Sequence, residues 1–119
     1  MQRFTDLKVW RQSHALLLEI YRLTRPFPSE ERYGVTSQLR RAALSVPTNI
    51  VEGSKRVGRT DYARFLNLAE SSLAETEYLL MVSRDLGYVT AAAVAPHFSA
   101  ITELARMLHM LRTEVERPQ

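Results

Sequence analysis

Residues 53 to 60 read GSKRVGRT, a stretch close to the phosphate-binding loop pattern G-x-x-x-x-G-K-[ST]. Both glycines and the threonine stand at fixed positions of that pattern, while Arg59 replaces its lysine. Such a loop cradles nucleotide phosphates with backbone N–H groups, but it must connect a buried strand to a helix. Because residues 42 to 52 have a helical pattern, we interpret the stretch as a basic turn between two helices.

Basic residues gather around this turn. Between residues 40 and 64, six basic side chains oppose two acidic ones, which leaves +4 in 25 residues of a chain whose total charge is +3. Arginine and lysine bind nucleic-acid phosphates without reading the base sequence, and a helix N-terminus also favours an anion. The sequence therefore predicts a candidate surface for RNA or DNA, and a solvated basic face without a partner is the alternative. The candidate residues are Arg40, Arg41, Lys55, Arg56, Arg59 and Arg64.

A second set of polar residues interrupts the apolar stripes on either side of the turn. Asn49 and Glu52 fall in the segment before it, and Ser72 and Glu75 fall in the segment after it. Buried polar groups need hydrogen-bond partners, so we expect these four side chains to form a buried polar layer. Its expected role is to fix helix register or subunit contacts. The alternative is a catalytic carboxylate pair formed by Glu52 and Glu75.

Other catalytic and metal-binding patterns are missing from the sequence. The chain has no cysteine, which excludes disulfides, thiolate metal ligands and thiol nucleophiles. None of the three histidines belongs to the Glu-x-x-His motif of di-iron bundles or to an H-x-x-x-H zinc pattern. No G-x-S-x-G elbow presents a serine nucleophile. We therefore predict a protein that is not an enzyme and uses no metal ion or cofactor.

The elements that position these residues are predicted to be helices. Three turn-forming stretches divide the chain into four segments with helical apolar spacing and without strand signals. Short connections between such segments favour an all-α fold, an antiparallel up-down-up-down four-helix bundle that forms one domain over residues 1–119. The expected helices cover about residues 6–25, 35–56, 61–86 and 91–116.

Threonines and prolines bear on the ends and the shape of these helices. Pro47 falls inside the second segment and removes a backbone donor, so we expect the second helix to be kinked there. Thr60 is expected to cap the third helix. Pro96 leaves two alternatives for the fourth: Thr90 caps a short turn and the main helix begins at Pro96, or one helix bends there.

The first helix is apolar over most of its surface, since polar residues occupy only a narrow strip. A helix of this kind is buried on two sides. We expect it to pack against its own bundle and also against another copy of the chain. The candidate oligomer-interface residues are Trp10, Leu17, Ile20 and Tyr21.

Composition narrows the class of protein. The chain has 119 residues, of which 45% are hydrophobic and 24% are charged, as in an ordinary soluble domain. The opening residues MQRFTDLKVW carry charge where a signal peptide needs an apolar run, and no apolar stretch approaches the length of a membrane span. We expect a cytoplasmic protein without a membrane partner.

The run from residue 37 to residue 53, SQLRRAALSVPTNIVEG, resembles the signature of the 23S rRNA-intervening sequence protein family. These are small bacterial four-helix-bundle proteins first named from intervening sequences in large-subunit ribosomal RNA genes. Three other pieces agree with the resemblance: Phe4-x-x-Leu7-x-Val9-Trp10, Phe27-Pro28 with Glu31, Tyr33 and Gly34, and SLAETE at residues 72–77.

The resemblance implies a cytosolic bundle that assembles into a ring, most often a homopentamer, and that has no established activity. A related protein of diversity-generating retroelements has a similar fold, forms a basic pentamer and works with a reverse transcriptase and nucleic acid. The prediction is therefore a non-enzymatic homo-oligomer that binds RNA or DNA through its basic surface. An oligomeric scaffold for an unidentified protein partner, without nucleic-acid binding, is the alternative.

Overall fold

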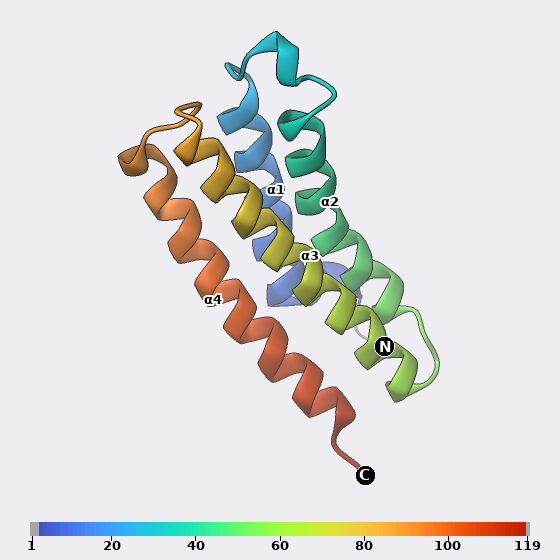
Figure 1. The fold of residues 1–119 in the computed structure, drawn as a ribbon. Helices are drawn as coiled ribbons and strands as arrows, with labels where there is room; N and C mark the ends of the chain where they lie inside the picture. Colours follow the sequence, from blue (N-terminus) through green and yellow to red (C-terminus); the bar gives the residue numbers. More distant parts are fainter. Residues whose placement is uncertain (1–2, 119) are drawn as a thin grey trace.

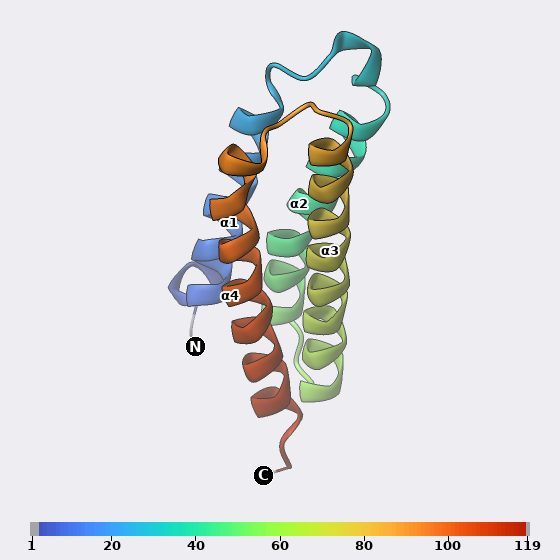
Figure 2. The same cartoon turned by 60° about the vertical axis from the view of Figure 1, so that its left-hand side comes forward.

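Four helices form a bundle in the computed structural model, which describes residues 3–118 (Figure 1). No strand occurs within that range, so the all-α prediction is confirmed. Two short 3-10 helices precede α1 and α2, and the chain passes from one end of the bundle to the other along each α-helix in turn (Figures 1 and 2). The elements are η1 (Phe4–Asp6), α1 (Lys8–Thr24), η2 (Ser29–Glu31), α2 (Val35–Ser54), α3 (Arg59–Asp85) and α4 (Ala91–Glu116).

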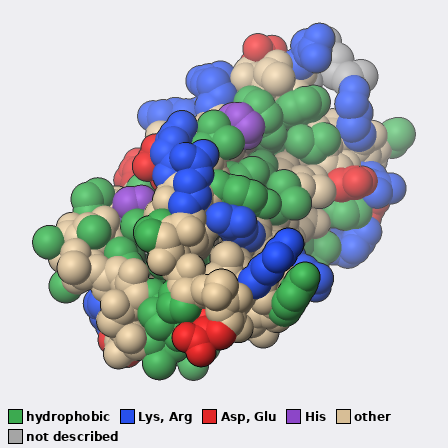
Figure 3. Space-filling model, turned by 90° about the horizontal axis from the view of Figure 1, so that it is seen from above, with side chains coloured by type: hydrophobic (Ala, Val, Ile, Leu, Met, Phe, Trp, Pro, Cys, Tyr) green, Lys and Arg blue, Asp and Glu red, His purple; other side chains and the backbone are tan. Residues whose placement is uncertain are grey.

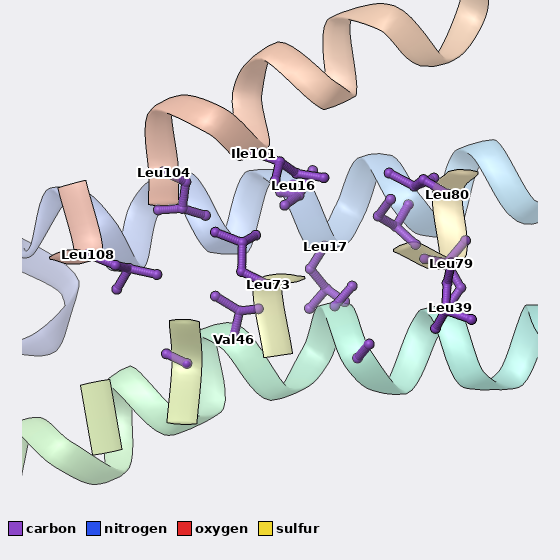
Figure 4. Packing of buried hydrophobic residues seen from close by; sticks show 14 of the residues in the cluster. Leu16, Leu17, Leu39, Val46, Leu73, Leu79, Leu80, Ile101, Leu104 and Leu108 are labelled. Carbon is purple, nitrogen blue, oxygen red and sulfur yellow. The ribbon is translucent and has the colours of Figure 1, made fainter. Parts of the chain in front are cut away.

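The core lies along the bundle axis and receives apolar side chains from all four helices (Figure 4). Among the four α-helices, α2 and α3 share the largest contact, and α1 and α4 share the smallest. Leu39 and Val46 of α2 and Leu80 of α3 have no exposed surface. Complete burial of a side chain of this size stabilises the fold by about 1.5–3 kcal/mol. The α2–α3 contact is therefore the most extensive one between helices of the bundle.

The helix ends agree with the sequence at α4 and differ at α3. Thr90 caps α4, since its side-chain oxygen accepts a hydrogen bond of 3.0 Å from the backbone N–H of Ala93. The helix then continues past Pro96 without a break. Thr60 does not cap α3, because Gly58 is the N-cap and its carbonyl accepts the first helical bond from the N–H of Tyr62. The kink expected at Pro47, a buried residue inside α2, stays a prediction.

Gly53, in the last turn of α2, allows that helix to approach α3 closely. A Cβ atom at this position would lie 2.8 Å from the Cβ of Phe65 and 3.0 Å from Cδ1 of Tyr62. Contacts this short force a displacement in a close-packed interior. The first glycine of GSKRVGRT therefore belongs to a helix contact, because α2 extends through it to Ser54.

A second contact ties the α1–α2 connection to the α3–α4 connection. The hydroxyl of Tyr88 donates a hydrogen bond of 2.6 Å to Oε2 of Glu31. The Tyr88 ring also lies 5.5 Å from the ring of the buried Phe27. The bond from Tyr88, and then the backbone N–H of Val35, lower the pKa of Glu31, whereas the bond to Glu31 raises the pKa of Tyr88. This end of the bundle is thus held by an ionised carboxylate.

We expect Gly53→Ala to destabilise the protein by about 1–3 kcal/mol, the usual cost of overpacking. Alanine is the better helix former by about 1 kcal/mol, so destabilisation would reveal the close contact and not helix propensity. Denaturant unfolding followed by circular dichroism measures the change. Gly58→Ala is the matched control, because no atom lies within 4 Å of its added Cβ, and it should lose less than about 1 kcal/mol. A Gly53 variant as stable as the wild type would contradict the close approach.

We expect Tyr88→Phe to lower the free energy of unfolding at pH 7, because Glu31 loses a hydrogen bond to its charged form. A carboxylate whose pKa is lower in the folded than in the unfolded protein stabilises the fold. That contribution is complete above the unfolded pKa of about 4.3, and it is lost as the pH falls through the folded pKa. The difference between variant and wild type should therefore shrink as the pH falls below about 4. Unfolding curves between about pH 3 and pH 7 measure this, and a difference independent of pH would refute it.

Candidate nucleic-acid interface

The six predicted basic residues lie in two groups at opposite ends of the bundle. Arg40 and Arg41 stand in the first half of α2, near the α1–α2 connection, whereas the other four surround the α2–α3 turn (Figure 1). From Arg41 to Lys55 the helix rises by about 21 Å, at 1.5 Å per residue. The stretch from residue 40 to residue 64 therefore does not form one surface, because a helix spreads its neighbours in sequence along its own length.

Two arginines of the turn are partly neutralised. The guanidinium of Arg56 lies 3.4 Å from Glu52 and 3.6 Å from Asp61, and that of Arg64 lies 2.9 Å from Asp61. Both guanidiniums also rest on the ring of Phe65, at 4.5 and 4.4 Å from its centroid. All four charged side chains are well exposed. Exposed pairs contribute only about 0–1 kcal/mol, so a phosphate group can compete for these arginines.

Lys55 and Arg59 carry the uncompensated charge at this end. Neither forms an ion pair within residues 3–118, and Arg59 donates a hydrogen bond to the backbone carbonyl of Arg117. Beside them α3 begins at the N-cap Gly58, which offers no side-chain acceptor to the first N–H groups of the helix. Free N–H groups and the positive end of the helix dipole both attract anions.

A cavity of about 750 Å³ opens beside this helix start, between α3 and α4. Arg59 and Arg64 line it from α3, and Arg112 lines it from α4. Arg112 donates hydrogen bonds to Glu70 and, at 3.0 Å, to Glu116, and the bond to Glu70 raises the pKa of Arg112. The sequence reasoning missed Arg112, because only the packing of the end of α4 against the start of α3 brings it to this cavity.

At the opposite end of the bundle, Arg40 and Arg41 differ in role. Nε of Arg40 donates a hydrogen bond of 2.8 Å to the hydroxyl of Thr24, and its guanidinium lies 4.4 Å from the centroid of the Tyr21 ring. Arg40 therefore joins α2 to α1. Arg41 is exposed and makes no hydrogen bond or ion pair within the described residues. Arg41 is free to bind an external anion.

The polar layer between α2 and α3 is smaller than predicted. The amide of Asn49 donates hydrogen bonds to the carbonyl and the hydroxyl of Ser45, at 2.8 and 2.9 Å, and Ser72 donates one of 2.8 Å to the same hydroxyl. Glu52 and Glu75 do not join this layer, because both lie on exposed outer faces. The predicted four-residue layer is therefore wrong for Glu52 and Glu75, since burying two carboxylates without matched partners would cost several kcal/mol each.

The candidate oligomer interface on α1 also needs correction. Leu17 and Ile20 are 9% and 0% exposed, so they pack inside their own bundle and present no surface to a second copy. Trp10 is half-buried, and Tyr21 remains 40% exposed. Of the four predicted residues, only Trp10 and Tyr21 therefore keep surface outside the bundle.

Two residues that the sequence reasoning did not select complete the outer face of α1. The ring of His14 stacks on Trp10, with centroids 5.0 Å apart and planes 7° apart. Leu18 is 42% exposed. His14, Leu18 and Tyr21 follow one another at steps of four and three residues, which places them on one face of the helix. Helical spacing continues from His14 equally well to Leu17 or to Leu18, and only the packing of the bundle shows that Leu17 is buried and Leu18 exposed.

Metal-binding and membrane-spanning features are missing from the described part of the chain. Residues 3–118 contain no group of three or more His, Asp and Glu side chains that could hold a metal ion. None of the helices there combines the length and the apolar character needed to cross a bilayer.

Comparison with known proteins gives two matches of interest and one negative result. A family model described as 23S rRNA-intervening sequence protein matches residues 5–110. A solved structure from Bacteroides thetaiotaomicron, a protein of unknown function from the S23 ribosomal protein family, is 25% identical with a TM-score of 0.81. The similarity covers 87% of this chain and 97% of that one. No curated protein matches the chain.

Proposed function

This chain belongs to the 23S rRNA-intervening sequence protein family, and we propose that it is a non-enzymatic subunit of a cytoplasmic homo-oligomer that binds RNA or DNA. The family resemblance supports a pentamer as the assembly. The observation that carries nucleic-acid binding is the set of exposed cations around the N-terminus of α3: Lys55, Arg56, Arg59 and Arg64. Two of them, Arg59 and Arg64, border the open cavity beside the start of α3.

Phosphate contact is the chemistry that fits this surface. Lys55 and Arg59 have no carboxylate partner within residues 3–118, and the pairs of Arg56 and Arg64 are exposed. Contacts to phosphate position a protein on nucleic acid but do not read its bases. One such surface binds weakly, and a closed ring repeats it in every subunit, so several weak contacts add through multivalency.

A protein scaffold is the second candidate, and a groove between α1 and α4 favours it. The groove has a volume of about 490 Å³, with Leu16 and Leu104 on its walls and Glu19 and Glu103 among its polar residues. His97 also lines it, and Nδ1 of that ring is buried without a hydrogen-bond partner. Glu19 and Glu103 are each paired with an arginine, so the apolar walls are what suit an amphipathic helix of another protein. In this case the cations of the turn would be incidental.

We expect labelled RNA and duplex DNA to bind with an affinity that falls steeply between about 50 and 200 mM salt. The double variant Lys55→Ala with Arg59→Ala should bind more weakly and reduce the slope of log affinity against log salt by about two, one for each lost phosphate contact. Fluorescence anisotropy measures both. The control is Arg22→Ala with Arg106→Ala, which removes equal charge from exposed pairs far from the turn. Absence of binding at low salt would refute nucleic-acid binding and favour the scaffold.

We expect the wild-type protein to sediment as an oligomer, and Leu18→Glu to shift it toward smaller species. Leu18 is 42% exposed on the outer face of α1, so a glutamate there places a charge in the proposed contact without disturbing the core. Met110→Glu, at a position of α4 that is 56% exposed, is the matched control and should leave the assembly unchanged. A wild-type monomer at micromolar concentration would overturn the proposed assembly.

A further inference from the structure

The second basic group, at the α1–α2 end, borders a groove of about 390 Å³. Arg32, Arg40 and Arg41 line the groove, and none of them forms an ion pair within residues 3–118. No acidic residue lines it. In Figure 3, which looks down on this end of the bundle, Lys and Arg side chains lie beside exposed hydrophobic ones. The three arginines of this groove therefore have no carboxylate partner, whereas carboxylates partly neutralise two arginines at the α2–α3 turn.

An aromatic side chain stands open beside these cations. Tyr33 is 85% exposed, although tyrosine normally buries much of its ring, and the guanidinium of Arg32 lies 5.5 Å from its centroid. Nearby, the ring of Tyr21 supports Arg40, which the hydroxyl of Thr24 also holds. One arginine is thus held in place, while a tyrosine face remains available for stacking.

A buried threonine also belongs to the lining of this groove. Thr36 lines the groove and is only 9% exposed, and its Oγ1 has no hydrogen-bond partner within the described residues. A buried polar atom without a partner is uncommon and destabilising. Because this atom is buried, Thr36 adds to the wall of the groove and offers no accessible hydroxyl to a ligand.

We propose that this groove binds an unpaired nucleotide of single-stranded RNA or DNA, with the base stacked on Tyr33 and the phosphate held by Arg41 and Arg40. The inference rests on the proposed function and specifies which form of nucleic acid this end of the bundle binds. Stacking on an aromatic ring requires an unpaired base, because the faces of paired bases are covered within a duplex. A simple phosphate ligand would make no use of the open tyrosine.

The test compares a labelled single-stranded oligonucleotide with a duplex of the same sequence, using the full chain at low salt. Tyr33→Ala should weaken single-strand binding by roughly 5- to 150-fold, the effect of one lost stacked base, and change duplex binding by less than about twofold. Tyr33→Phe should keep the wild-type affinity, because the stacking ring remains. Tyr78→Ala, at a tyrosine of α3 that is 62% exposed, is the matched control and should also bind like the wild type.

Three outcomes separate this inference from the proposed function. If Tyr33→Ala binds single strands like the Tyr78 control, while Lys55→Ala with Arg59→Ala weakens binding, the groove is refuted and the surface at the turn stands. If neither nucleic acid binds, both proposals fail. If Tyr33→Ala changes the sedimenting species, the groove is a contact between subunits and the inference is overturned.

Discussion

The packing of α2 against α3 is the constraint on which the rest of the structure depends. These helices share the largest contact in the bundle, with the fully buried Leu39 and Val46 on one side and Leu80 on the other. Near the middle, the hydroxyls of Ser45 and Ser72 form the one polar bridge that joins the two helices within residues 3–118. At the end, Gly53 lets the backbones approach. A hydrogen bond in an apolar contact favours one register, because any shift leaves its polar atoms unpaired.

That register decides where the charges go. Once the inner faces of α2 and α3 are filled by apolar side chains and serines, the arginines and glutamates must occupy the outer faces and the ends. The short turn after Gly53 then places Lys55 and Arg59 at the start of α3, where the helix dipole adds to their positive potential. Arg40 and Arg41, on the same helix as Gly53, are carried to the other end. The same packing therefore creates two separate basic surfaces.

Helical periodicity predicted the all-α fold, but it could not tell which side chains on neighbouring faces of a helix are buried. The hydroxyl of Thr90 caps α4 because local chemistry alone favours that position. Glu52 and Leu17 show the limit. Each lies beside an apolar stripe, so the sequence allows either a buried or an exposed position. The packing of the other helices decides that Glu52 is exposed and Leu17 buried. Arg112 could not be selected, because the residues around it at the cavity are distant in sequence. Tyr33 could not be selected either, because its exposure is decided by the fold.

The separation of the two basic surfaces has a consequence for an assembled ring. The chain is elongated, with extents of 49 × 24 × 20 Å, and the surfaces lie at its opposite ends. Cyclic symmetry repeats every surface at the same height along the ring axis. In a ring whose subunits stand parallel to that axis, the turns around Lys55 would form one rim, and the grooves beside Tyr33 would form the other. Phosphate contact without base reading would then belong to one rim and stacking on unpaired bases to the other, so a ring could hold a duplex and a single strand at once.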